Sequence, residues 1–468
     1  MFSKDIHAFS DRVLIETDTG EHIHYCEVGE WADQLKAKVA ARSLVFCLAD
    51  NSIGSIAGYL AFMTVRIVPL LLSVGIDQQL LQHLLTLYRP QFIWQPQGCL
   101  TCGKQARVVL RLSSYELVEW ASEPVDLHPD LGLLLSTSGS TGSPKLVRLS
   151  YRNVESNADS IASYLNLSKN ERPITSLPSH YSYGLSVINS HFHVGATLLA
   201  TNASVVQREF WEFARQAKAS SIAGVPYTYE MLRRLRFFSM ELPDLHTMTQ
   251  AGGHFPKERV KEYLEYAKSS GKAFIVMYGQ TEATARMSYL PFSRAEEKLG
   301  SVGIAIPGGR FQLLHDDGKE ILEPSVTGNL VYSGPNVSLG YAQSREDLGL
   351  EDERCGVLET GDLAYRDPDD FYFIQGRKNR FVKIYGNRVN LDEVEALVRR
   401  INVDCACVGQ EDMISVYVTS AESQELVQVY LAEKTGLNRR AFNVRVVQSI
   451  PKTAAGKTQY SQLSVANI

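Results

Sequence analysis

The sequence predicts an α/β fold in which helices cover mainly parallel sheets, followed by a small α+β unit. Between about residues 10 and 130, short apolar stretches that suit buried strands alternate with stretches whose apolar residues recur at helical spacing. This alternation is typical of parallel sheets whose strands are connected by helices. From Asn390 onward the pattern becomes a helix, a strand, a second helix and a second strand, which indicates a separate small unit.

Individual elements follow from the same periodicities. Continuous apolar runs predict buried strands, and apolar residues three and four apart predict helices. The predicted strands are residues 43–48, 91–94, 133–135, 273–277, 413–418 and 442–447. The predicted helices are residues 30–41, 78–88, 392–400 and 424–435, and another begins after Leu149 with Ser150 or Asn153 as its N-cap.

Length and composition describe an ordinary globular chain. It has 468 residues, a formal net charge of −5 and 44% hydrophobic residues, which allows two to four domains and a large core. A mildly acidic balance provides no electrostatic footprint for nucleic acid. Residues 1–12 lack the apolar segment of a signal peptide. These features together lead us to expect a cytoplasmic protein.

The most apolar long stretch, residues 53–75, is the best candidate for a membrane span. It carries Arg66 near its centre and Pro69 shortly afterwards. A charge at that depth disfavours a span. We therefore predict a buried helix followed by a strand, and no membrane span.

Cysteine usage indicates free thiols. Seven cysteines are scattered along the chain, with one pair at Cys99 and Cys102 and another at Cys405 and Cys407. A scattered set is not typical of a disulfide framework. A zinc site would require both pairs to meet or further ligands, and the sequence offers no clear set of these.

A loop rich in serine and glycine follows the predicted strand at 133–135. Its residues are Thr137, Ser138, Gly139, Ser140, Thr141 and Gly142, and Pro144 and Lys145 end it. Small residues let backbone N–H groups and hydroxyls converge on an anion, and the lysine adds charge. The common P-loop is excluded, because only two residues separate these glycines. A flexible linker is the alternative, but the leucines before the loop and Pro-Lys after it disfavour a linker.

This loop resembles the nucleotide-binding signature of the adenylate-forming superfamily, which includes acyl-CoA synthetases, luciferases and peptide-synthetase adenylation domains. Later segments resemble further motifs of that family in the same order. The resemblance implies a large N-terminal α/β body, residues 1–378, that binds ATP and a carboxylate. It also implies a mobile C-terminal lid, residues 379–468, which turns about Asn379, where the family usually has Asp or Lys.

The segment Tyr278-Gly279-Gln280-Thr281-Glu282 resembles the family's Y-G-x-T-E motif. An aromatic ring can stack on adenine, a threonine hydroxyl can bind phosphate oxygens, and a carboxylate can hold Mg²⁺. The resemblance therefore makes Thr281 and Glu282 catalytic candidates, Glu282 the metal ligand, and ATP and Mg²⁺ the cofactors. A strand followed by a capped helix is the structural alternative.

Further nucleotide-binding candidates come from the same resemblance. Gly252 and Gly253 resemble a strand end whose flat backbone lies against adenine, although a bulge or turn would explain them equally well. Asp362 would bind both ribose hydroxyls, and Arg377 would contact ribose and phosphate. Lys457, in the closing segment 451–458, would act on charge that develops as the adenylate forms. A Walker A reading of this segment fails, because position 451 is a proline.

The segment Pro178 to Gly184 resembles the family segment that opens a helix beside the carboxylate substrate, which makes His180 a catalytic candidate. A histidine between aromatic residues is otherwise usually structural. Amino-acid-activating relatives have an aspartate here, but no acid occurs between Pro178 and Asn189. A buried ammonium without a counter-charge is costly, which disfavours an α-amino acid unless Glu230 or Asp244 folds into reach. Residues 180–183 suit a polar or aromatic acid better than a long alkyl chain.

The predicted function is that of an acid–thiol ligase. ATP-dependent activation of a small carboxylic acid to an acyl-adenylate releases pyrophosphate, and the acyl group then passes to a thiol, expected to be coenzyme A. One alternative is the loading of a separate carrier protein, since the sequence contains no carrier attachment motif. Another is a non-catalytic adenylate-binding protein, which the presence of Lys457, Glu282, Asp362 and Arg377 disfavours.

Overall fold

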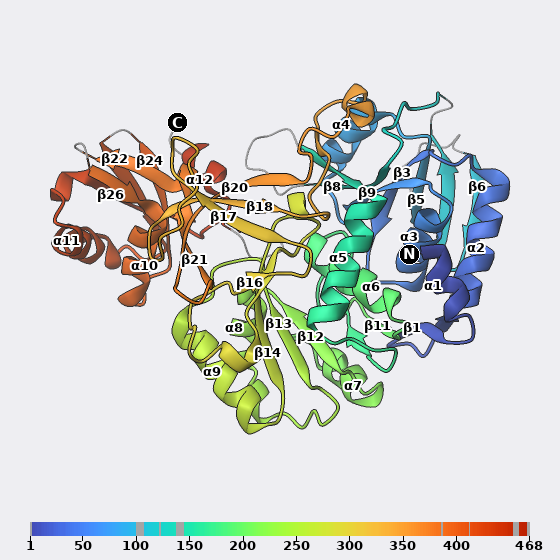
Figure 1. The fold of residues 1–468 in the computed structure, drawn as a ribbon, viewed down its shortest axis with the longest axis horizontal. Coiled ribbons are helices and arrows are strands. Elements are labelled where there is room, and N and C mark those ends of the chain that lie inside the picture. The colour runs from blue at the N-terminus through green and yellow to red at the C-terminus, as the bar shows by residue number, and fades with distance from the viewer. Residues whose placement is uncertain are drawn as a thin grey trace. The chain divides into compact units, whose positions relative to one another are not determined.

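The chain divides into two compact units. A computed structural model describes residues 2–99, 107–120, 123–136, 145–384, 387–410, 412–452 and 458–465. Of these residues, the first unit comprises those within 2–136, 145–310 and 332–358, and the second comprises those within 311–331 and 359–465. The colours of Figure 1 follow the chain through both units. A domain boundary after Lys378 stays a prediction.

The first sheet of the first unit has eight strands in the order β19-β9-β8-β4-β3-β5-β7-β6. Strands β8, β4, β3 and β5 are parallel neighbours, and antiparallel strands extend the sheet on both sides. Their bounds are β3 Leu44–Ala49, β4 Val68–Ser73, β5 Phe92–Pro96, β6 Val108–Leu112, β7 Tyr115–Glu119, β8 Leu131–Ser136, β9 Leu146–Ser150 and β19 Gly340–Ala342.

The second sheet of this unit has nine strands in the order β16-β15-β14-β13-β12-β10-β11-β1-β2. The six strands from β14 to β1 run parallel to one another. Their bounds are β1 Val13–Thr17, β2 His22–His24, β10 Pro173–Ile174, β11 Leu198–Ala200, β12 Ser221–Gly224, β13 Thr247–Gln250, β14 Ala273–Tyr278, β15 Ser288–Tyr289 and β16 Ile304–Ala305.

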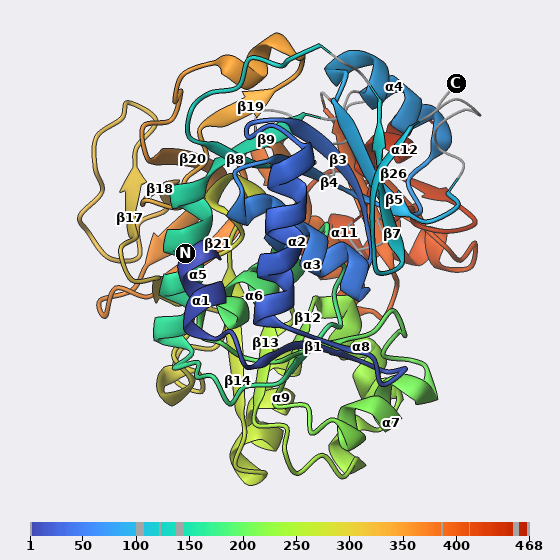
Figure 2. The ribbon, with the colours of Figure 1, turned by 90° about the vertical axis from the view of Figure 1, so that its right-hand side faces the viewer.

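Helices form the layer between the two sheets and cover their outer faces. The main core joins residues of both sheets to α2 (Tyr25–Lys38), α3 (Ile53–Thr64), α5 (Tyr151–Tyr164) and α6 (Ser182–His193). Figure 2 shows α2 and α3 side by side. Helix α4 (Gln78–Tyr88) packs on the other face of the first sheet. Helices α7 (Arg208–Gln216), α8 (Pro226–Arg234) and α9 (Lys257–Ser269) flank the second sheet in Figure 1.

One buried arginine links two neighbouring strands of the first sheet. Arg148 of β9 is fully buried. Its guanidinium donates to the carbonyls of Leu339, Tyr341 and Leu350 and pairs with Glu353 at 2.9 Å. These contacts hold β19 against β9, because each buried N–H group needs an acceptor.

The second unit contains a four-stranded sheet and a smaller α+β module. The sheet has the order β17-β18-β20-β21. In the module, β24, β25 and β26 form a sheet, and α10, α11 and α12 pack near it. The bounds are β17 Arg310–Leu314, β18 Gly328–Ser333, β20 Val357–Arg366, β21 Tyr372–Arg377, β22 Phe381–Ile384, β23 Asn387–Asn390, α10 Leu391–Arg400, β24 Cys405–Gln410, β25 Met413–Val418, α11 Ser423–Thr435, β26 Phe442–Val446 and α12 Tyr460–Val465.

The predicted fold class is confirmed, and so are most element positions. The helix at 78–88 and the strand at 413–418 match the structure at both ends. The predicted helix 30–41 belongs to α2, which begins five residues earlier, at Tyr25. Residues 53–75 form the buried helix α3 and the strand β4, as expected. Within the described ranges, no helix combines the length and apolar character needed to cross a bilayer.

Candidate active site

A tight turn after β14 presents the predicted catalytic pair. Strand β14 ends at Tyr278, and the 3₁₀ turn η2 (Thr281–Ala283) leads back toward β15. Position 279 must be glycine here, because a Cβ atom would lie 1.8 Å from the carbonyl oxygen of Ala285. The Gln280 carbonyl accepts from the N–H groups of Ala283 and Ala285, each at 3.0 Å. The backbone thus fixes the position of Thr281 and Glu282 at the carboxyl end of the strand.

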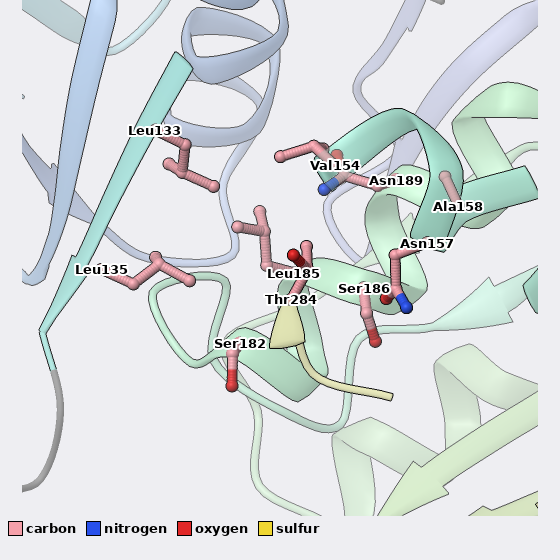
Figure 3. A pocket seen from close by; sticks show the side chains of 10 residues that line it. All are labelled: Leu133, Leu135, Val154, Asn157, Ala158, Ser182, Leu185, Ser186, Asn189 and Thr284. Atoms are coloured by element: carbon pink, nitrogen blue, oxygen red, sulfur yellow. The ribbon is translucent and has the colours of Figure 1, made fainter. Parts of the chain in front are cut away.

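Thr281 contacts the first residue of α6. Its Oγ1 atom lies 3.0 Å from the Oγ atom of Ser182, within hydrogen-bond distance. Figure 3 shows Ser182 on α6, beside the turn that carries Thr284. A pocket of about 10 Å³, which Ser182 helps to line, lies between β8, α5 and α6. It has room for about one water, so it is too small to hold an acid substrate.

Glu282 is hydrogen-bonded to Tyr341 of β19. The Tyr341 hydroxyl donates to Glu282 Oε1 at 2.7 Å. Two cations lie over the Tyr341 ring, with Lys145 Nζ at 5.5 Å and Arg354 Cζ at 4.9 Å from the ring centre. Burial and the Glu282 carboxylate raise the pKa of Tyr341 to about 12, although Arg354 opposes this shift. The hydroxyl therefore stays a donor, and the structure brings Lys145 close to the residue that holds Glu282.

The surroundings of Glu282 fit a magnesium ligand. Mg²⁺ is typically held by one or two carboxylates, and phosphate oxygens or waters complete its coordination. Oε1 of Glu282 is oriented by Tyr341. Among the described residues, none donates a hydrogen bond to Oε2, which leaves that oxygen for a cation. Second-shell contacts of this kind orient a metal-binding carboxylate.

His180 lies in the turn before α6. Neighbouring Ser179 holds this turn, because its Oγ donates to the Asp50 carbonyl at 2.6 Å and its N–H donates to Asn51 Oδ1. Nδ1 of His180 is buried and has no hydrogen-bond partner among the described residues. Burial lowers the pKa of His180, although the backbone of Ala49 opposes the shift. The imidazole is therefore neutral at physiological pH and has one nitrogen left for a ligand.

Gly252 adopts a left-handed conformation with φ of +88°. A Cβ atom there would lie 2.6 Å from the hydroxyl oxygen of Tyr181, so only glycine lets the two approach. Gly253 follows on the exposed side of the same turn. This conformation fits both alternatives, a flat surface for a base and a simple turn.

A group of apolar and aromatic residues, which we call the α6–sheet cluster, lies between α6 and the carboxyl ends of β12, β13 and β14. Ligands of open α/β sheets bind at such strand ends. The buried members are Leu177, Tyr183, Val187, Ala223, Val225, Ala251 and Met277, and Tyr164, Tyr181, Ile275 and Tyr289 pack against them.

Asp362 and Arg377 lie opposite each other in the second unit. They are register partners on β20 and β21. Arg377 Nε is 3.4 Å from Asp362 Oδ1, and Arg377 is largely exposed while Asp362 is buried. Asn379 follows in the 3₁₀ turn η5 (Lys378–Arg380), between β21 and β22. A carboxylate and a guanidinium in this arrangement offer both an acceptor and donors to a ligand.

Several predicted site residues fall outside the described residues. These are Thr137, Ser138, Gly139, Ser140, Thr141, Gly142 and Lys457.

The structure adds two residues that the sequence did not indicate. Tyr341 donates to Glu282 and Arg354 lies over the Tyr341 ring, although neither belongs to a recognisable pattern of polar residues. Tyr341 lies in a short strand and Arg354 in a loop, so only the tertiary fold could reveal them. Ser182 was visible as part of the His180 segment, but its contact with Thr281 was not.

The comparisons with known proteins identify the family of the chain. The model of the AMP-binding enzyme family matches residues 2–342. The chain therefore belongs to the family of AMP-binding enzymes, which is the predicted family.

Its relatives include ligases that act on quite different acids. The chain is 30% identical over 320 residues to a long-chain-fatty-acid–CoA ligase of Escherichia coli O6:H1, covering 67% of this chain and 54% of the relative. It is 29% identical over 323 residues to a feruloyl-CoA synthase of Amycolatopsis, covering 65% and 62%. The matched part thus spans little more than half the length of these relatives.

Among solved structures, the fold is similar to that of o-succinylbenzoate coenzyme A synthetase from Bacillus subtilis, in complex with ATP and a magnesium ion. The TM-score is 0.78 at 20% sequence identity, and the match covers 99% of this chain and 98% of the other. At this level of identity the similarity shows a shared fold.

Proposed function

We propose that this protein is an acid–thiol ligase that activates a carboxylic acid with ATP and transfers the acyl group to coenzyme A. The observation that carries the proposal is the fixed pair Thr281 and Glu282 at the end of β14, held by Ser182 and Tyr341. The pair offers a hydroxyl for phosphate and a carboxylate for Mg²⁺ at one point. Family membership and the ATP and magnesium of the Bacillus structure support this assignment.

Each site residue has a proposed role. Tyr278, Gly279, Gln280, Gly252 and Gly253 receive adenine, and Asp362 and Arg377 bind the ribose. The glycine loop from Thr137 to Gly142, with Lys145 and Thr281, binds the phosphates. Glu282 holds Mg²⁺, which neutralises part of the phosphate charge when bound.

The chemistry needs no protein nucleophile. An oxygen of the substrate carboxylate attacks the α-phosphorus of ATP, a new P–O bond forms, and the bond to pyrophosphate breaks. Both reacting groups are anionic and repel each other. His180 donates to or orients the carboxylate in this proposal, and Lys457 stabilises the charge that develops on the phosphate. Catalysis is therefore positioning and electrostatic stabilisation.

The thiol step completes the proposed cycle. The sulfur of coenzyme A attacks the acyl carbon of the adenylate, and AMP leaves. We propose that residues 379–468 act as a lid that turns about Asn379 between the two steps, with residues 1–378 as the body. ATP and coenzyme A are cytoplasmic metabolites, which supports a cytoplasmic location.

The proposed acid has no α-ammonium group. Glu230, one possible counter-charge, is engaged elsewhere, because Arg259 Nε lies 3.1 Å from its Oε1 and Arg233 Nε 4.0 Å from its Oε2. The residues around His180 and Tyr181 offer aromatic rings and neutral polar groups. An ammonium buried among those neutral groups would not be neutralised by Glu230.

A pyrophosphate-exchange screen tests the proposal. The full chain is incubated with ATP, Mg²⁺ and labelled pyrophosphate across a panel of short acyl, aryl, dicarboxylic and α-amino acids. Exchange that depends on one of the first three classes supports the proposal, and preferred exchange with a free amino acid contradicts the substrate class. The best acid is then offered coenzyme A or phosphopantetheinylated carrier proteins. Transfer only to a carrier would replace coenzyme A as the acceptor.

A further inference from the structure

Arg286 is a buried arginine whose contacts are all with neutral groups. It follows the catalytic turn and is 2% exposed. Its Nε donates to Ser186 Oγ at 3.0 Å, and its Nη1 donates to the Tyr164 hydroxyl at 3.0 Å and contacts Met277 Sδ at 3.2 Å. The guanidinium carbon lies 5.0 Å from the centre of the Tyr183 ring. These contacts fix the side chain without neutralising it.

The charge of Arg286 has no protein counter-ion in the part of the chain that the structure describes. No carboxylate of those residues forms an ion pair with it, and its Nη2 donates to none of their acceptors. Hydroxyls and an aromatic face compensate a buried cation only partly. Two N–H groups of a planar fork therefore remain for an acceptor, and carboxylates match that fork best.

Arg286 lies next to the α6–sheet cluster. Two members of the cluster touch it, Met277 near the end of β14 and Tyr183 on α6. Tyr164 also lies beside Arg286, and its ring stacks on that of Tyr289 with 4.2 Å between the ring centres. Bulky side chains thus surround the guanidinium.

Helix α6 contacts both Arg286 and the catalytic turn, so its geometry indicates how far apart they are. Ser182 contacts Thr281, and Ser186 contacts Arg286. Figure 3 shows both serines on this helix. They are four residues apart, which corresponds to about 6 Å along a helix. A substrate that extends from Thr281 to Arg286 is therefore only a few carbon atoms long.

We propose that Arg286 is a specificity-determining residue that binds a second carboxylate at the far end of the substrate, so that the preferred acid is a short dicarboxylic acid. This inference rests on the proposed function, since the first carboxylate is the one that is activated. Ser186 and Tyr164 act as positioning residues, because they hold the guanidinium and leave its Nη2 edge for the substrate. The positive charge is then neutralised only when the correct acid is bound.

Matched pairs of acids test the proposal. Dicarboxylic acids of three to six carbons are compared with monocarboxylic acids of equal length, in pyrophosphate exchange and in calorimetric binding. We expect the wild type to prefer one diacid over its monoacid at least tenfold in kcat/KM. Arg286→Met should lose at least 100-fold with that diacid and change less than fivefold with the monoacid, and Arg286→Lys should retain part of the preference. Arg233→Met, on the outer helix α8, is the matched control and should keep the wild-type ratio.

The two readouts separate this proposal from the proposed function. If the wild type activates monoacids as well as diacids, or if Arg286→Met lowers both equally along with the melting temperature, Arg286 is a structural strut and the inference is overturned. If diacids bind in an Arg286-dependent manner without any exchange, the binding site stands and the ligase assignment fails. If neither binding nor exchange is found with any acid, both proposals fall.

Discussion

The hydroxyl of Tyr341 and the carboxylate of Glu282 form a 2.7 Å hydrogen bond between residues 59 positions apart in the chain. The bond orients one oxygen of the proposed magnesium ligand. Tyr341→Phe keeps the ring that Lys145 and Arg354 contact but removes this donor. We expect the Mg²⁺ concentration for half-maximal pyrophosphate exchange to rise about tenfold, as is typical when a second-shell partner of a metal ligand is lost.

The comparison for this variant is Glu282→Gln, which removes the ligand itself and should have the larger effect. A magnesium titration of both variants shows which substitution has the larger effect on the Mg²⁺ requirement. An unchanged magnesium response in Tyr341→Phe would show that the hydrogen bond does not serve the metal site.

Asp362→Ala should weaken nucleotide binding by about 1.5–3 kcal/mol, the value typical of hydrogen bonds to a charged group. Calorimetry with a non-hydrolysable ATP analogue measures it. Asp370→Ala is a suitable control, because its carboxylate pairs with Arg366 near the loop between β20 and β21. Equal affinities for both variants would reduce Asp362 to a structural partner of Arg377.

Lys457→Ala should lower the rate of adenylate formation about 10²–10³-fold, because it removes a charge aimed at the developing negative charge. Binding of ATP should change little. The control is Lys452→Ala in the same segment. The Lys452 ammonium pairs with Asp404 at 3.2 Å, and its loss should leave the single-turnover rate as in wild type. A rate within threefold of wild type for Lys457→Ala would remove this lysine from the mechanism.

The buried, neutral imidazole of His191 leads us to expect that the protein loses stability in acid. The side chain is 3% exposed, and burial lowers its pKa from 6.5 to about 4. The unfolded chain therefore takes up a proton near pH 6.5, while the folded chain resists until about pH 4. The contribution to stability is complete above pH 6.5 and is lost as the pH falls, by about 3 kcal/mol.

Urea unfolding between pH 7 and pH 4 checks this expectation. In His191→Asn, an amide that can still donate to the Val187 carbonyl replaces the imidazole, and the acid slope should flatten. A slope that matches the wild type would assign the acid sensitivity to other groups.

The fold was largely predictable because strong local signals agreed with the tertiary structure. The helix from Gln78 to Tyr88 has apolar residues on one face only, and Ser150 caps α5 together with Asn153 in a reciprocal pair of hydrogen bonds. The start of α2 was missed because Tyr25 and Cys26 interrupt the polar pattern before the apolar spacing becomes clear. Sheet order was not predictable, since it brings together strands that are far apart in the chain, such as β9 and β19.

Only those residues of the candidate site that belong to a recognisable sequence motif were predictable. Thr281 and Glu282 stand in a recognisable segment, so their place at the end of β14 followed from the sequence. Tyr341, Arg354 and Arg286 were not visible, because a single aromatic or basic residue has no local signature. Their roles arise from distances between elements that are far apart in the chain, such as the 3.0 Å from Arg286 Nη1 to the Tyr164 hydroxyl.

The pairing of β1 with β11 has a consequence for synthesis of the chain on the ribosome. Arg12, just before β1, donates to the carbonyl of Gly195, and 183 residues separate the two. At about 5–20 residues per second, the first strand waits roughly 10–40 seconds for its parallel neighbour to be translated. Its edge is open during that interval, and open edges recruit foreign strands. Strand β1 thus waits for a neighbour that is translated well after it, which makes yield sensitive to translation speed and to chaperones that shield nascent chains.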